Sequence, residues 1–135
     1  MAGNIRLEVV TPETSVVSEE VQIVVAPGTL GEFGALKGHT PFLTTLKLGT
    51  LRYKDLNGVE KYVFINSGFA ETLPDKVTVL AESAERRRDI DLARVKAAIK
   101  RAQERLASKK PDINHERARA ALHKALYRLK LAETR

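Results

Sequence analysis

The chain has 135 residues, 43% of them hydrophobic and 30% charged, which is typical of one globular domain or two very small ones. Its lack of cysteine excludes a disulfide framework and a thiolate metal site, and no apolar run approaches the roughly 20 residues of a membrane-spanning helix. The net charge of +6 is uneven: residues 1–85 carry 7 basic and 11 acidic side chains (−4), and residues 86–135 carry 16 and 6 (+10). This asymmetry indicates two units with different roles.

Residues 1–85 have the pattern of a β-domain. Apolar and charged residues alternate from Ile5 to Val9, which predicts a strand with one buried face. A second apolar run, residues 21–25, is expected to stop at Pro27-Gly28.

Residues 31–46 are rich in glycine and proline. Glycine permits positive φ, and proline fixes its own φ, so this segment predicts a tightly shaped bend that buries its apolar side chains. Such a bend either locks a β-fold or forms a contact surface. The residues concerned are Gly31, Gly34, Gly38 and Pro41, with Phe33, Leu36, Phe42 and Leu43 between them.

Two hairpins follow the bend. Asn57-Gly58 lies between the apolar runs 48–56 and 59–65 and predicts a type I′ turn, in which both central residues have positive φ. Residues 68–73 and 76–80 form a second pair about Pro74-Asp75. Short strands with regular turns predict an all-β sandwich or barrel of about 80 residues.

Residues 86–135 change to helical periodicity. One stripe consists of Leu92, Val95, Ile99, Ala102 and Leu106, and a second of Ala118, Leu122, Ala125, Leu129 and Ala132. Asp89 or Asp91 is expected to cap the first helix, and Asp112 or Asn114 the second, on either side of a break at residues 108–112. The fold class is therefore α+β, a β-sandwich followed by an antiparallel two-helix hairpin. Its alanine-rich seam buries little apolar area, so the hairpin is expected to depend on docking, a ligand or another protein.

No catalytic constellation emerges. Lys37 precedes Gly38 in the reverse order from a phosphate loop, and His39, His115 and His123 have no metal-binding spacing. Asp89 and Asp91 are better explained as helix caps than as an acid–base pair. The sequence therefore does not predict an enzyme.

The basic tail is the main functional signal. Arg94 and Arg101 share one helical face, Lys124 and Arg128 share another, and Asp91 lies one turn before Arg94. This set suits a nucleotide, with cations for phosphates and a carboxylate for base or ribose. A solvated basic face and a nucleic-acid footprint are the alternatives, although aromatic interleaving and a nucleic-acid motif are lacking.

Three motifs, taken in order, resemble the epsilon subunits of bacterial F-type ATP synthases over essentially the whole chain. They are Gly31-Glu32-Phe33-Gly34 through Gly38-His39-Thr40-Pro41; Asn66-Ser67-Gly68-Phe69 with residues 74–81; and Ala84-Glu85-Arg86 leading to Asp89-Ile90-Asp91. The resemblance implies a non-catalytic central-rotor subunit on the cytoplasmic face of the bacterial plasma membrane, attached only through the complex. The gamma subunit and the c-subunit ring are the implied neighbours of the β-domain, with Glu32 toward the c ring and His39 toward gamma.

The resemblance also implies a brake on ATP hydrolysis. In many bacterial members the hairpin extends into the catalytic head of alpha and beta subunits. A tail of charge +10 suits acidic surfaces there, and Arg117, Arg119, Lys124 and Arg128 are the expected contacts.

ATP is implied as a regulatory ligand, with no cofactor required. Residues 90–95 match the family's ATP-binding pattern Ile/Leu-Asp-x-x-Arg-Ala except that Val95 replaces alanine. Glu85, Ile90, Asp91, Arg94, Arg101 and Arg128 fall on family positions, and Lys124 stands where the strongest binders have arginine. Weak ATP binding and no binding are both open, as are a free-standing nucleotide sensor and a basic nucleic-acid-binding module.

Overall fold

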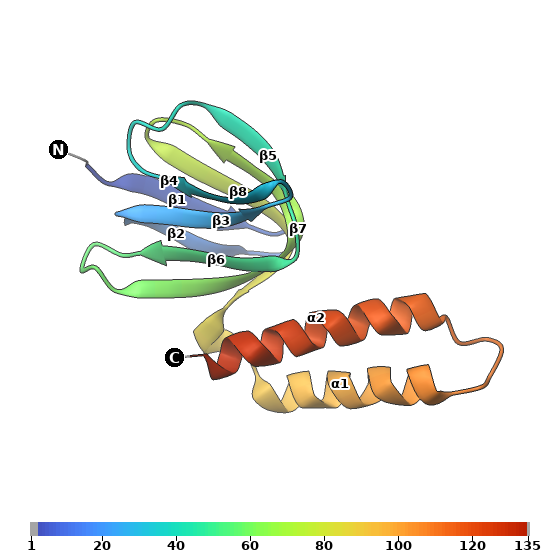
Figure 1. Ribbon diagram of the computed structural model, residues 1–135. Helices are drawn as coiled ribbons and strands as arrows, with labels where there is room; N and C mark the ends of the chain where they lie inside the picture. The colour runs from blue at the N-terminus through green and yellow to red at the C-terminus, as the bar shows by residue number, and fades with distance from the viewer. Residues whose placement is uncertain (1–2, 135) are drawn as a thin grey trace. The chain divides into compact units, whose positions relative to one another are not determined.

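The computed structural model describes residues 3–134 and divides into two compact units, with the boundary in the sequence between Arg87 and Arg88. The first unit contains eight strands: β1 (Ile5–Val10), β2 (Ser15–Val21), β3 (Ile23–Gly28), β4 (Gly31–Ala35), β5 (Phe42–Leu46), β6 (Gly49–Lys54), β7 (Glu60–Thr72) and β8 (Lys76–Arg86). They follow the order β2-β1-β8-β7-β5-β3-β4, and β6 pairs with both β3 and β7. The strands form a sandwich (Figure 1), which confirms the predicted fold class.

Alternating side chains fill the core of this sandwich. Ile5, Leu7 and Val9 of β1 are fully buried, as the alternation predicted. β1 pairs antiparallel with β2 and parallel with β8, so the first strand lies between two others. Each of the seven strands from β2 to β8 also contributes core side chains. They include Val21, Val24, Ala35, Leu46, Leu51, Tyr53, Val63, Ile65, Val77 and Val79.

Strands β2 and β3 differ from the sequence prediction. β2 was not predicted, and β3 continues through Pro27-Gly28 to a turn at residues 29–30. β3 pairs with β6 at residues 23–25 and with β5 at Gly28, so Pro27 lies where the partner strand changes. On the other side of β3, Pro27 pairs with Glu32 within the β3–β4 ladder, which keeps its register from Val24 to Gly28.

The glycine-rich segment forms two strands, β4 and β5, rather than a buried bend. Gly31 and Gly38 have φ of 136° and 90°, whereas Gly34 has no positive φ and lies within β4. Phe33 is half-buried, but Leu36, Phe42 and Leu43 are exposed. The prediction that this segment buries its apolar side chains is therefore wrong for these three; Phe42 and Leu43 begin β5, and Leu36 lies in the loop after β4.

The turn between β6 and β7 contains Asn57-Gly58, but it is not type I′. Gly58 has φ of 79°, and Asn57 does not have positive φ. The ladder closes at Lys54 and Glu60, and Asp55 organises the five residues between them. Its Oδ1 accepts from the amides of Asn57 (2.9 Å) and Val59 (3.0 Å). These bonds, with that of Val59 the largest, lower the pKa of Asp55.

β7 is one strand of 13 residues where two strands were expected. Its ladder with β8 keeps the same register on both sides of Ser67, whose φ of 52° is a local irregularity within the strand. Gly68 has φ of 136°, and a Cβ placed there would stand 2.1 Å from the Leu80 carbonyl oxygen. No other residue type fits this position without moving backbone.

Arg86, at the end of β8, joins β2 and β6. Its guanidinium donates through Nε to the Val16 carbonyl oxygen (2.9 Å) and through Nη1 to the Tyr53 hydroxyl (3.0 Å). Its Nη2 lies 3.4 Å from Glu19 Oε2, to which the Tyr53 hydroxyl also donates. Burial raises the pKa of Tyr53. The network closes one edge of the sandwich with polar groups that satisfy one another.

The second unit is a helical hairpin, as predicted (Figure 1). A short 3₁₀ turn, Arg87–Asp89, precedes α1 (Leu92–Ala107), and α2 spans His115–Glu133. Asp91 caps α1 and Asn114 caps α2, each among the predicted alternatives. The predicted stripes contribute the buried Val95, Ala102, Ala118 and Ala125, whereas Leu92, the first stripe residue, is exposed.

Candidate functional site

An apolar surface lies around the β4–β5 connection. We call Leu30, Phe33, Leu36, Phe42 and Leu43 the β4–β5 surface. Leu30 is 99% exposed and Leu43 69%, and the Phe33 and Phe42 rings meet edge to face at 5.2 Å. Apolar side chains exposed to water are candidates for an interaction site.

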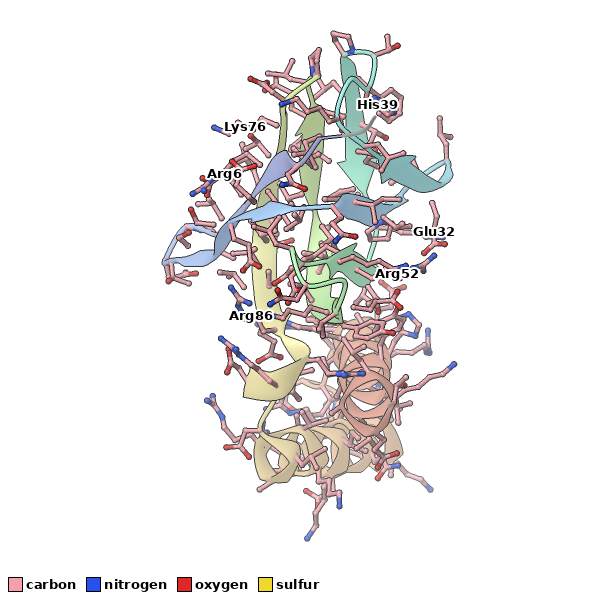
Figure 2. The ribbon with its side chains drawn as sticks, turned by 90° about the vertical axis from the view of Figure 1, so that its left-hand side faces the viewer. Arg6, Glu32, His39, Arg52, Lys76 and Arg86 are labelled. Atoms are coloured by element: carbon pink, nitrogen blue, oxygen red, sulfur yellow. The ribbon has the colours of Figure 1, made fainter. Side chains whose placement is uncertain are left out.

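Glu32 precedes Phe33 on β4, and its side chain is 52% exposed. Arg52 of β6 donates through Nη1 to Glu32 Oε2 at 3.1 Å, and Arg52 Nε lies 3.6 Å from Glu60 Oε1. Figure 2 shows Arg52 and Glu32 on the same side of the sandwich. The predicted contact carboxylate is thus ion-paired within its own chain.

His39 is half-buried between β4 and β5 (Figure 2). Its Nδ1 lies 2.5 Å from the Thr40 carbonyl oxygen, and its ring centroid is 6.3 Å from that of Phe42. The Gly38 amide donates to the Pro74 carbonyl oxygen, which fastens this turn to the β7–β8 connection. His39 is therefore oriented by its neighbours and remains partly accessible.

A groove of about 680 Å³, which the sequence did not predict, opens on the sandwich. Phe69 and Leu80, both 55% exposed, contribute apolar walls, and the Ser67 hydroxyl donates to Glu82 Oε2 at 2.9 Å. The remaining lining residues are Val10, Thr11, Pro12, Thr45, Leu46, Gly68 and Ala81. The signal available in the sequence was alternation, because burial of Ala70 and Val79 turns Phe69 and Leu80 outward.

The predicted nucleotide residues are divided between the two units. Glu85 belongs to β8 of the sandwich, and the others belong to residues 90–128. Asp91 uses its Oδ1 to accept from the amides of Ala93 (3.0 Å) and Arg94 (3.2 Å) as the α1 cap. Its carboxylate therefore has a structural role without any ligand.

The hairpin places some of these cationic side chains at the same end of the two helices. Arg94 lies in the first turn of α1 and Arg128 near the end of α2, so antiparallel packing places them at the same end of the hairpin. Arg94 and Arg101 are exposed, and Lys124 and Arg128 are half-buried. Ile90 is buried, and so is Val95, the departure from the ATP-binding pattern.

Basic side chains also occupy the rest of the hairpin. Arg117 and Arg119 are exposed in the first turns of α2. A shallow cleft of about 290 Å³ at the hairpin turn is lined by Arg101, Glu104, Arg105, Ser108, Lys110 and Ile113. Among residues 3–134 there is no group of three or more His, Asp or Glu that could hold a metal ion, and no helix long and apolar enough to cross a membrane.

Both units match known families. The beta-sandwich domain of the ATP synthase delta/epsilon chain matches residues 4–87, and the long alpha-helix domain of the same chain matches residues 88–133. The ATP synthase epsilon chain of Desulforapulum autotrophicum is 62% identical over 100% of both chains. That of Desulfatibacillum aliphaticivorans is 66% identical over 100% of this chain and 96% of the relative.

A solved structure has the same fold. A chain in the Euglena gracilis mitochondrial ATP synthase, in a structure of its OSCP, F1 and c-ring, superposes with a TM-score of 0.77 at 22% identity. The match covers 97% of this chain and 82% of that one.

Proposed function

The chain belongs to the ATP synthase delta/epsilon family, as its three motifs predicted, and on that premise we propose that it is a non-catalytic rotor subunit. In this proposal it couples proton translocation to ATP synthesis by joining the gamma subunit to the c-subunit ring. It reaches the membrane only through these partners, on its cytoplasmic face. The observation that carries the proposal is the set of exposed apolar side chains on one small sandwich, among them Leu30, Leu43, Phe69 and Leu80.

The β4–β5 surface is assigned to the c ring. Leu30 and Leu43 project into water, and Glu32 of β4 adds an exposed charge. An apolar centre with a polar rim has the composition of a protein interface. Burying these side chains against a partner removes apolar area from water, which favours association.

The groove is assigned to gamma. Its apolar walls and the exposed Phe69 and Leu80 suit an apolar segment of a second subunit. His39, held in place by Thr40 and Phe42, is a second proposed gamma contact. In this proposal the two contacts adjoin, because Leu43 lies two residues from the groove residue Thr45 on the same face of β5.

Reconstitution of an F-type ATP synthase depleted of this subunit tests the assignments. We expect Leu43→Ser to weaken retention of the c ring and Leu80→Ser to weaken retention of gamma. Leu56→Ser is the matched control, because Leu56 is 53% exposed in the β6–β7 turn, outside both surfaces. If all three variants restored the complex and ATP-driven proton pumping equally, the contact surfaces would be wrongly assigned.

The hairpin is proposed to inhibit ATP hydrolysis through catalytic alpha and beta subunits. Three of the five buried helix residues are alanine, beside Val95 and Leu131, so this seam buries less apolar area than a leucine seam would. Its exposed cations suit acidic surfaces, and such contacts weaken with salt.

Neutralising four cations together is the direct test of the brake. Replacement of Arg117, Arg119, Lys124 and Arg128 by Gln is expected to raise ATP hydrolysis by the assembled enzyme. The same change at Lys96, Lys100, Lys109 and Lys110, all exposed, removes equal charge and is expected to have less effect. Equal hydrolysis by both variants would reduce the brake to a general charge effect and refute these contacts.

ATP is proposed as a ligand of the folded hairpin. If it binds that form alone, it stabilises the form by RT ln(1 + [L]/Kd). Titration calorimetry of the full chain with MgATP tests this, with Asp91→Asn and Arg94→Ala as variants. Asparagine retains the α1 cap and removes the charge, so Asp91→Asn separates ligand binding from helix stability.

Saturable heat that both variants lose would support a nucleotide site. Absence of heat at millimolar MgATP from a folded chain would contradict it.

A further inference from the structure

Arg52 and Glu32 meet across an intervening strand. Val25 of β3 pairs with Gly34 of β4 on one side and with Arg52 of β6 on the other. Neighbouring strands lie about 4.8 Å apart, so β4 and β6 are separated by about 10 Å. Burial of Leu51 and Tyr53 turns Arg52 to the outer face, where its long side chain spans this gap to Glu32. The opposite residue on β4, Gly34, has no side chain to intervene.

One guanidinium serves two carboxylates from opposite flanks. Nη1 of Arg52 donates to Glu32 Oε2 at 3.1 Å, and Nε lies 3.6 Å from Glu60 Oε1 of β7. Two different nitrogens of the planar guanidinium make these contacts, so Arg52 can hold both carboxylates at the same time. The three side chains together carry a charge of −1.

We propose that Arg52 is a positioning residue that holds Glu32 for a cationic side chain of the subunit docking on the β4–β5 surface. This rests on the proposed function, which gives Glu32 its contact role. Arg52 engages Oε2, and Oε1 of the same carboxylate is directed to an arginine or lysine of the partner. The net negative charge of the cluster selects a cation, and Leu30, two residues before Glu32 in the sequence and 99% exposed, offers an apolar contact.

Pre-ordering is the physical contribution of Arg52. An exposed glutamate samples several rotamers, and a partner that binds it must stop this motion. Arg52 restricts Glu32 before the partner arrives. The gain is that of an exposed ion pair, so loss of Arg52 is expected to weaken association about two- to fivefold.

The test uses the full chain and an F-type ATP synthase depleted of this subunit. The measured quantities are the chain concentration that restores half of ATP-driven proton pumping and the pumping rate at saturation. Variants are Glu32→Gln, Arg52→Gln, the double variant and Arg52→Lys. Arg6→Gln is the matched control, because Arg6 is a similarly exposed arginine paired with Glu8 on β1.

We expect Glu32→Gln and Arg52→Gln each to raise the half-restoring concentration about two- to fivefold without changing the saturated rate. The double variant is expected to equal the larger single effect, because the two residues act through one contact. Arg52→Lys is expected to behave like Arg52→Gln, since one ammonium cannot hold both carboxylates in this geometry. Arg6→Gln and the unfolding midpoints of the isolated variants should not change.

Two results would overturn the inference, and they differ in meaning. If Glu32→Gln weakens association and both Arg52 variants do not, Arg52 does not position Glu32, while the proposed contact stands. If Glu32→Gln has no effect, the contact role assigned to Glu32 itself fails. Additive effects in the double variant would also refute a shared contact.

Discussion

Substitution of three glycines of the sandwich allows the cost of backbone strain to be measured separately from the cost of steric overlap. Gly31 and Gly68 share a φ of 136°, but a Cβ at Gly31 meets no atom within 4 Å. At Gly68 the same atom would stand 2.1 Å from the Leu80 carbonyl oxygen and 2.8 Å from Ala81 Cα. Gly34 lacks positive φ, and its Cβ would make only ordinary contacts at 3.9 Å and 4.0 Å.

Replacement of each glycine by alanine gives graded expectations. Gly31→Ala incurs strain alone and should cost about 1–3 kcal/mol of unfolding free energy. Gly68→Ala adds overlap with backbone, which costs about a further 1–3 kcal/mol. Gly34→Ala should be neutral or stabilising by up to about 1 kcal/mol, because it restricts the unfolded chain without strain.

Urea unfolding followed by tyrosine fluorescence measures these values, since Tyr53 and Tyr62 lie in the sandwich. The order of stability should be Gly34→Ala, then Gly31→Ala, then Gly68→Ala. Equal losses of unfolding free energy for Gly31→Ala and Gly68→Ala would show that the β8 backbone moves away from the new Cβ at no cost. A loss above about 1 kcal/mol at residue 34 would contradict the strain argument itself.

Three further predictions concern local networks. The pKa of Asp55 is lower in the folded chain than its ordinary value of 3.8. The ionised carboxylate therefore stabilises the fold at any pH above 3.8, and this stabilisation is lost as the pH falls through the pKa of the folded state. Asp55→Asn should therefore flatten the acid side of a plot of urea midpoint against pH; an unchanged slope would contradict this. Arg86→Met removes the guanidinium that pairs with Glu19 and donates to the Tyr53 hydroxyl, and it should lower the unfolding free energy in urea by about 1–3 kcal/mol. Arg88→Met, at an exposed position, should lower it little. Asn114→Ala removes the α2 cap and should cost about 0.5–2 kcal/mol of helix stability by circular dichroism, and Asn114→Asp should not; equal melting of the two would refute the cap.

Local pattern was sufficient for most elements of the fold. Alternation predicted β1, and helical spacing predicted α1 and α2 with caps at Asp91 and Asn114. Such signals are carried by neighbouring residues and hold wherever the element packs. The ordered motifs also identified the family.

Local pattern failed where a partner strand decides the conformation. Strand β2, with the sequence SVVSEEV, has weak alternation and forms a strand through pairing with β1. Pro27 was read as a stop, yet β3 passes through it where the partner changes. The glycine segment was expected to bury its apolar side chains, but whether a side chain is covered depends on what packs over it.

The candidate sites divide in the same way. The sequence alone determined the residue types available, including Glu32 beside apolar residues and the basic hairpin with its alanine seam. Only the tertiary structure decided which of them meet. Arg52 and Glu32 are 20 residues apart in sequence, Arg86 and Glu19 are 67 apart, and the groove joins four strands with the loop after β1. Strand order sets these contacts, and it is fixed by burial of one shared core rather than by any local segment.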